Sequence, residues 1–261
     1  ITPALILFMI FVWFETIYPE SGTPSHIAVA IILYLIVTCT GMLVFGKTCW
    51  LKHGEAFSIL FYLLSLCSIT EIQRKGHLYQ LRIRPLAAGL MKKQSSSWGT
   101  VVFIMIALGS VSFDGLSETP LWVDITIFSE PFFRNFGQFV AINSVGLLTF
   151  IIIFLVGYMF FALLMNILSG SFTLRTKLTQ QTTYSLLPIA VGYLVAHYLS
   201  FLIIQGQLLI PLISDPFGWE WDLLGTGDYA INIGIINARF AWIASVISIV
   251  TGHILAVFCS H

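Results

Sequence analysis

The stretch FVAINSVGLLTFIIIFLVGYMFFALLMNIL, residues 139–168, runs for 30 positions without an Asp, Glu, Lys, Arg or His. A helix needs about 20 mainly apolar residues to cross the hydrocarbon core of a bilayer. The rest of the chain is similarly apolar, because 57% of its 261 residues are hydrophobic, 9% are charged and the mean hydropathy is +0.93. Soluble domains carry roughly 25% charged residues. The composition therefore predicts a polytopic integral membrane protein.

Apolar stretches of similar length predict an all-α transmembrane helix bundle of about six spans that forms a single membrane domain, residues 1–261. The predicted spans are residues 2–18, 26–46, 99–116, 139–168, 184–212 and 235–260. The connecting loops are residues 47–98, 117–138 and 213–234. Within the first loop, the apolar segment 54–69 is too short to span, which predicts a short re-entrant or interfacial helix.

Charge is segregated along the chain. Ten of the twelve Lys and Arg residues fall in segments 47–93 and 175–177, whereas most Asp and Glu residues fall in or beside the other loops. Since basic loops stay on the cytoplasmic side, these two segments are predicted to be cytoplasmic in a multi-pass protein of the cell membrane. A net charge of zero gives no indication of a nucleic-acid partner. As an alternative to a pure topology signal, basic side chains can bind anionic lipid head groups; the candidates are Arg74, Lys75, Arg82, Arg84, Lys92 and Lys93.

Histidines within predicted spans are candidate functional residues, because an ionisable group is costly inside a bilayer. His197 lies 14 residues before Pro211, hence about 21 Å from the predicted outer end of its span. His253 is expected at a similar depth on an antiparallel helix, and His261 falls on the same broad face. Paired imidazoles can hold a transition metal or haem, or pass protons. The alternative is packing through hydrogen bonds to neighbours such as Tyr193, Tyr198, Ser200 or Asn166.

Acidic residues form a second candidate site on the outer side: Asp114, Glu118, Asp215, Glu220 and Asp222. Clustered carboxylates suit a divalent cation, although acidic outer loops are also the ordinary counterpart of basic inner ones. The expected depth of the histidines places them too far from these acids for one site to use both sets. Arg239, at the outer start of its span, is expected to pair with Glu15 or an outer-loop acid.

Several segments resemble a family of bacterial polytopic membrane proteins, some members of which are named fenitrothion hydrolase. They are WFETIYP at 13–19, GMLVFGKTCWLKHGEAFSILFYLLS at 41–65, GSVSFDGLSETPLW at 109–122, VAHYLSFLIIQGQ at 195–207, SDPFGWEWDLLGT at 214–226 and GHILAVFCSH at 252–261. The resemblance implies a hydrolase of organophosphate esters. The shared segments contain Glu55, Asp114, His197, Gln205, Gln207, Asp215, Trp221, Asp222, His253 and His261.

Three function classes remain open from the sequence. The first is a membrane-bound hydrolase that uses a metal held by His197 and His253 or by the outer acids. The second is an accessory or cofactor-carrying subunit that packs against other membrane subunits in the lipid bilayer. The third is a transporter, for which His197, Gln205, Gln207 and His253 could begin a polar path.

Overall fold

A computed structural model describes residues 2–76, 78–91, 97–133, 137–168 and 182–260. It confirms the predicted all-α fold, because the structure is 76% helical and the sheet found among the described residues has two strands. In the described part of the chain, five helices are long and apolar enough to cross a membrane, consistent with an integral membrane protein.

These five helices correspond to the second through sixth predicted spans. They are α2 (Pro24–Phe45), α5 (Trp98–Ser117), α7 (Gln138–Leu168), a continuous run from η3 (Tyr184–Leu186) through α9 (Leu187–Gln205) and η4 (Gly206–Leu208) to α10 (Leu209–Ser214), and α11 (Ala238–Ser260). The first predicted span is the shorter helix α1 (Thr2–Thr16). Its 15 residues rise about 22 Å, less than the roughly 30 Å of a hydrocarbon core.

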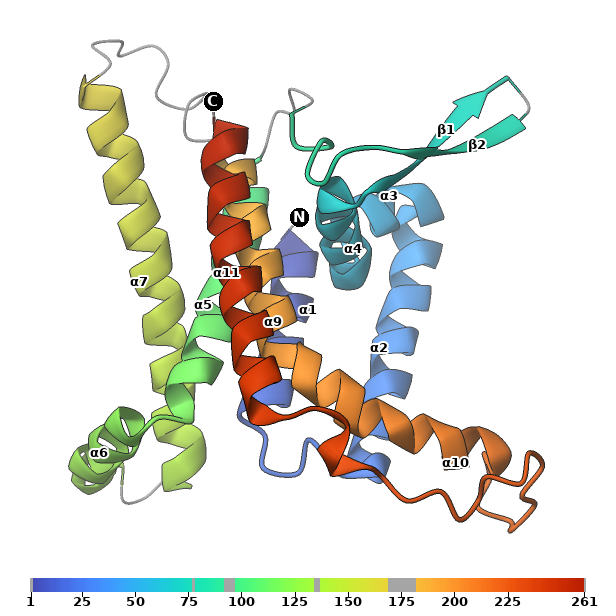
Figure 1. Ribbon diagram of the computed structural model, residues 1–261. Helices are drawn as coiled ribbons and strands as arrows, with labels where there is room; N and C mark the ends of the chain where they lie inside the picture. Colours follow the sequence, from blue (N-terminus) through green and yellow to red (C-terminus); the bar gives the residue numbers. More distant parts are fainter. Residues whose placement is uncertain (1, 77, 92–96, 134–136, 169–181, 261) are drawn as a thin grey trace.

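Helices α1, α5, α9 and α11 form a central group. Figure 1 shows α7 on one flank of this group and α2 standing apart on the other. Helix α5 contacts α1, α7 and α9, and α9 packs along α11. Helix α2 buries only Gly41 and is attached mainly through α3 (Lys47–His53), whose Trp50 side chain fills the space beside that glycine. The apolar faces of α2 are therefore left for lipid.

The core of the molecule is centred on α5, which packs against α7, α1 and α9. The rings of Phe8 and Phe103 stack with their centroids 4.4 Å apart, and Ile104 and Met105 beside them are almost fully buried. In a membrane, such close packing holds helices together because lipid is as apolar as the side chains and provides little hydrophobic drive. The α1–α5 contact is therefore one part of an apolar core that also includes buried side chains of α4, α7 and α9.

Helices α9 and α11 approach each other closely at two glycines. A Cβ added to Gly192 would lie 2.6 Å from the carbonyl oxygen of Ser248, and one added to Gly252 would lie 2.5 Å from that of Pro188. Ser245 donates a hydrogen bond to the carbonyl oxygen of Ala196 at 2.9 Å. These contacts fix an antiparallel register in which residue 188 is level with residue 252 and residue 196 with residue 245.

Short elements occupy the two ends of the bundle. One end carries α3, α4 (Ala56–Cys67) and the antiparallel strands β1 (Thr70–Lys75) and β2 (Leu78–Ile83); the other carries α6 (Pro120–Ser129), η1 (Glu130–Phe132), α10 and η5 (Ile233–Ile235) (Figure 1). Helix α4 is the predicted short apolar helix, capped by the Glu55 carboxylate, which accepts from the backbone N–H groups of Phe57 and Ser58. The hairpin and α6 lie in segments that the sequence analysis assigned to loops.

Candidate functional site

Polar side chains from three helices meet near the α6 and α10 end of the bundle. Glu15 is the last residue but one of α1, Asp114 lies in the last turn of α5, and His197 and Tyr198 lie in α9. Glu118, which follows α5, and Glu15 also interact electrostatically with His197. We call these five residues the acid–base cluster.

The centre of the acid–base cluster is the pair formed by His197 and Asp114. Nε2 of His197 lies 2.7 Å from Oδ2 of Asp114, so the protonated Nε2 donates to the carboxylate. In the neutral imidazole this arrangement leaves Nδ1 as a hydrogen-bond acceptor. No described residue makes a hydrogen bond to Nδ1. The two side chains are 28% and 23% exposed, so the pair is shielded but reachable.

A second polar pair lies directly beside the first. The hydroxyl of Tyr198 donates a hydrogen bond to Oε1 of Glu15 and thereby joins α9 to α1. The rings of His197 and Tyr198 meet edge to face, with centroids 4.7 Å apart and planes at 86°. Two hydrogen-bonded acid–base pairs therefore share one small region at the junction of α1, α5 and α9.

The expectation that His197 lies too deep to meet an outer acid is wrong, because it pairs with Asp114. The prediction assumed a straight helix from His197 to Pro211. In the structure the helical run from α9 to α10 bends, and α10 points sideways, away from the bundle (Figure 1). The 14 residues between His197 and Pro211 therefore do not measure depth. Asp114 lies in the last turn of α5, within the predicted span 99–116.

The structure does not bring His253 to His197. The α9–α11 register places His253 level with residues 187–188, about nine residues or 14 Å along α9 from His197. Nδ1 of His253 instead lies 2.8 Å from the carbonyl oxygen of Ile249, and its ring faces Tyr193 at 6.4 Å. His261 lies outside the described residues. A metal or haem held by His197, His253 and His261 stays a prediction.

Metal coordination has little geometric support in this part of the chain. Among the described residues, no group of three or more His, Cys, Asp or Glu side chains converges closely enough to hold a metal ion. His197 contributes a single imidazole, and Nε2 of that ring is already bonded to Asp114. The arrangement is therefore better suited to moving protons than to binding a metal.

The expected pairing of Arg239 with Glu15 is not found. Glu15 bonds to Tyr198, and Arg239 lies exposed at the start of α11. Within the ranges that the structure describes, Arg239 takes part in no ion pair. The carboxylate of Glu15 is satisfied by a tyrosine hydroxyl from the adjacent helix instead.

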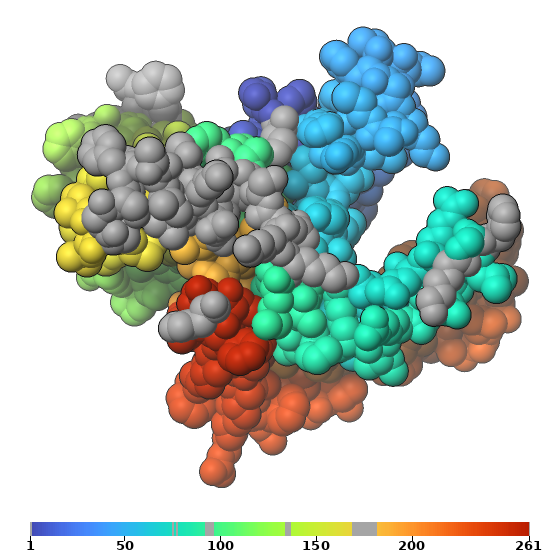
Figure 2. Space-filling view, turned by 90° about the horizontal axis from the view of Figure 1, so that it is seen from above, coloured from blue at the N-terminus to red at the C-terminus, as the bar shows by residue number. Residues whose placement is uncertain are grey.

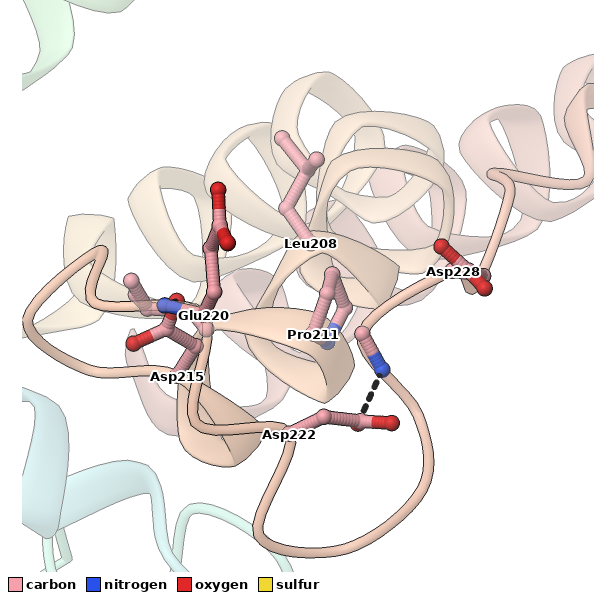
Figure 3. A pocket seen from close by; sticks show the side chains of 8 residues that line it. Leu208, Pro211, Asp215, Glu220, Asp222 and Asp228 are labelled. Carbon is pink, nitrogen blue, oxygen red and sulfur yellow. Dashed lines mark hydrogen bonds between the residues drawn. The ribbon is translucent and has the colours of Figure 1, made fainter.

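The predicted outer acidic cluster divides into two groups. Asp114 and Glu118 belong to the acid–base cluster, whereas Asp215, Glu220 and Asp222 line an open hollow of about 640 Å³ beside α10, together with Asp228. Figure 3 shows these four carboxylates around the helical turn from η4 into α10 that carries Leu208 and Pro211, with Asp228 set apart from Asp215 and Glu220.

Asp215 and Asp222 use their oxygens to hold the loop that contains them. Asp215 accepts from the backbone N–H groups of Trp219 and Glu220 at 2.9 and 2.7 Å, and Asp222 accepts from Gly227 and from the Ser214 hydroxyl at 2.7 and 2.8 Å. The bond from Gly227, followed by that from Ser214, lowers the pKa of Asp222. For Asp215, desolvation acts to raise the pKa, but the backbone hydrogen bonds outweigh it and lower the pKa. The role of both carboxylates is therefore to hold the loop in its conformation.

Gln207, another predicted polar residue, is also used structurally. Its side-chain N–H₂ donates to the carbonyl oxygens of Ile203 and Asn232, and its Oε1 accepts from the Tyr229 hydroxyl and the Asn232 N–H. Gln207 thus ties the loop before α11 to η4 rather than contributing to a polar path.

Comparisons with protein-family models, with curated proteins and with solved structures found no match for this chain.

Proposed function

We propose that this protein is a membrane-bound hydrolase in which His197, oriented by Asp114, activates water. One observation carries the proposal: Nε2 of His197 is held by Asp114 at 2.7 Å, while Nδ1 has no hydrogen bond from the described residues. A carboxylate that holds one imidazole nitrogen fixes the tautomer and the orientation of the ring, and leaves the other nitrogen to accept a proton.

The proposed reaction needs no group beyond water and these side chains. Nδ1 of His197 takes a proton from a water molecule, and the hydroxide attacks the carbon or phosphorus atom of an ester. The bond from that atom to the leaving oxygen breaks, and the leaving oxygen takes the proton back from His197. Ester and water are thereby converted to an alcohol or phenol and an acid. The single O–H of Tyr198 already donates to Glu15, so this residue positions the Glu15 carboxylate beside His197 and does not donate to the substrate.

The surroundings of the acid–base cluster favour a site that opens on one side of the membrane. They do not favour a polar path through the membrane. Towards the α3 and α4 end, α1 and α5 meet through the stacked rings of Phe8 and Phe103 and the buried side chains of Ala4 and Ile104. A transport path needs polar groups across the bilayer, and this apolar contact supplies none. Under the positive-inside rule, the cluster opens towards the outer side.

The substrate class that we propose follows from the location of the site and from the family resemblance. The acid–base cluster lies among apolar helices, so an ester that partitions into the bilayer can reach it from the membrane. The similarity to proteins named fenitrothion hydrolase suggests aryl phosphotriesters, which are apolar and uncharged. Carboxylic esters of aryl alcohols are the matching alternative within the same reaction type.

The proposal is tested with the purified protein in lipid nanodiscs and a panel of chromogenic 4-nitrophenyl phosphotriesters and carboxylic esters. The wild type should release 4-nitrophenolate, and His197→Gln should lower kcat by about 10²- to 10⁴-fold, the usual contribution of a general base. His253→Gln is the matched control, since it removes a histidine from the adjacent helix without touching the cluster. Failure of the wild type to hydrolyse any ester, or equal activity of His197→Gln, would overturn the assignment.

A further inference from the structure

The hairpin formed by β1 and β2 projects from the bundle as an arm. Figure 1 shows it leaving the top of α4 and extending beyond α2, and Figure 2 shows it reaching outward from the body of the molecule. Its attachment is confined to its base. There Arg84 donates to the carbonyl oxygens of Ser68 and Ser65 at 2.9 and 2.6 Å and lies 3.5 Å from Glu71. Among the described residues, no helix packs extensively against the rest of the hairpin.

The strand register gives the hairpin two different faces. Ile72 pairs with Leu81, and Gln73 with Gln80, so each pair shares a face and the two pairs lie on opposite faces. The first face carries four large apolar side chains and Arg74. These are Ile72, Tyr79, Leu81 and Ile83, which are 69, 72, 72 and 80% exposed. The other face carries the polar side chains of Glu71, Gln73, Gln80 and Arg82, together with Leu78, which is 71% exposed.

An exposed apolar face of this kind needs a cover. A two-stranded hairpin is marginally stable in water by itself and normally packs against something. Here the neighbouring surface is lipid. Helix α2, beneath the hairpin, exposes its apolar residues over a length of 22 residues, about 33 Å, which matches a bilayer. At the other end of the bundle, α10 extends to the same side as the hairpin. In the view of Figure 2 its orange atoms lie beneath the hairpin.

The charges of the hairpin favour an anionic surface. Arg74 and Arg82 are both exposed, and the acid of β1, Glu71, is matched by Arg84. Tyrosine, represented by Tyr79 on the apolar face, is enriched at the level of lipid head groups. An arginine side chain on such a face can lay its methylenes along the apolar surface and extend its guanidinium to a phosphate.

We propose that the β1–β2 hairpin lies on the bilayer surface, with the apolar face that carries Ile72, Tyr79, Leu81 and Ile83 inserted at the head-group boundary. Arg74, on that face, binds anionic lipid phosphate, and Arg82, on the opposite face, adds positive charge at the membrane surface. The apolar residues position the arm, and the arginines select the lipid. This assignment is independent of the chemistry proposed for His197.

The insertion is tested by single nitroxide labels on the full chain in nanodiscs, in a background with its four cysteines replaced by alanine. Labels at Ile72→Cys and Leu81→Cys should be relaxed by oxygen, which concentrates in lipid, and protected from a water-soluble nickel chelate. The neighbouring labels Gln73→Cys and Gln80→Cys, on the opposite face, should show the reverse. Equal access of the chelate to both faces would overturn the proposal, as would spin–spin broadening showing that hairpins of two copies pair.

The lipid preference is tested with spin-labelled phosphatidylglycerol and phosphatidylcholine. The wild type should bind the anionic lipid more strongly at low ionic strength. Removing each charge by Arg74→Gln or Arg82→Gln should reduce that preference by up to about fivefold, the effect of one basic residue near a charged membrane. Arg239→Gln, which removes an arginine from the opposite end, should leave the preference unchanged. An unaltered preference in the double hairpin variant would contradict the role of the arginines.

Discussion

At the residue scale, two acid–base pairs join apolar helices through hydrogen bonds between side chains. His197 pairs with Asp114, and Tyr198 with Glu15. In lipid no water is available to bond to an unpaired polar group. Each such group is therefore costly unless another helix supplies a hydrogen-bond partner. Pairing therefore both joins α9 to α1 and α5 and leaves functional groups at the junction.

Removal of the Tyr198 hydroxyl tests this account of pairing. Tyr198→Phe should lower the free energy of unfolding by about 1 to 2 kcal/mol, because the Glu15 carboxylate loses its hydrogen-bond donor. The change is measured by thermal or denaturant unfolding in mixed micelles. Tyr193→Phe, on the same helix, is the control and should cost much less. Similar losses in both variants would show that the bond to Glu15 contributes little.

The Asp222 loop gives a pH-dependent prediction. Its pKa is lowered below the ordinary 3.8 by the bonds from Gly227 and Ser214. A carboxylate with a depressed pKa stabilises the folded loop above its ordinary pKa, and the effect is lost as pH falls through the lower folded value. Protection of the Gly227 amide from hydrogen exchange, relative to the free-peptide rate, should therefore fall below about pH 4. Asp222→Asn should remove this dependence. An unchanged pH profile in that variant would refute the role of Asp222.

The sequence identified His197 and Asp114 individually but not as a pair. An ionisable residue in an apolar stretch can be recognised from the sequence, because the free-energy cost of placing it in a membrane belongs to that residue alone. Its partner is not, because the meeting of α9 and α5 depends on the bend between α9 and α10, which the apolar pattern does not encode. The same limit explains Glu15, for which an arginine was expected and Tyr198 was found.

At the element scale, small residues determine which helices touch. Three helix glycines lie against a neighbouring helix: Gly109 lies against Ile151, Gly146 against Trp122 and Gly192 against Ser248. Gly157 has nothing near the position of its absent side chain. Sequence alone cannot distinguish a contact glycine from an open one, since the difference lies in the facing helix.

A large side chain at the α9–α11 contact should separate these helices. Gly252→Leu places atoms 2.5 Å from the carbonyl oxygen of Pro188 and should cost about 1 to 3 kcal/mol or more. Gly157→Leu is the matched control, because no atom lies within 4 Å of its added Cβ. Unfolding in the same detergent measures both. Equal stability of the two variants would contradict the observed register.

The hairpin was predictable in principle but not recognised. Residues 70–83 alternate between a face with Ile72, Tyr79, Leu81 and Ile83 and a mainly polar face that also contains Leu78, around Gly76 at positive φ. This period of two is typical of a strand. Its basic residues were interpreted as a topology signal, and the strands are too short to stand out in a chain dominated by helical spans. Helix α6 was not predicted, although its first residue, Pro120, is a type common at helix starts.

At the scale of the whole molecule, the two ends differ in charge and in architecture. One end carries the basic hairpin and α4, and the other carries the acid–base cluster, α6 and the acidic loop beside α10 (Figure 1). The lengths and composition of the spans were predictable, since hydropathy is a property of the chain. Their lateral order and the bend of α9 into α10 arise from packing between helices and were not.

The basic segments predict the orientation of the molecule in the membrane. In intact cells, a membrane-impermeant thiol reagent should label Glu220→Cys and leave Lys52→Cys unlabelled, in a background without native cysteines. Permeabilised cells serve as the control, in which both positions should react. Labelling of Lys52→Cys alone in intact cells would invert the topology and place the acid–base cluster on the cytoplasmic side.

The central claim is that His197 and Asp114 act together on water, and a double-mutant cycle on ester hydrolysis tests it most directly. His197→Gln, Asp114→Asn and the double variant are compared by kcat/KM in nanodiscs. Because residues that act as a unit lose their effect once either is removed, the double variant should be about as slow as His197→Gln alone. Single effects that multiply in the double variant would show that the two residues act independently and would contradict the proposed site.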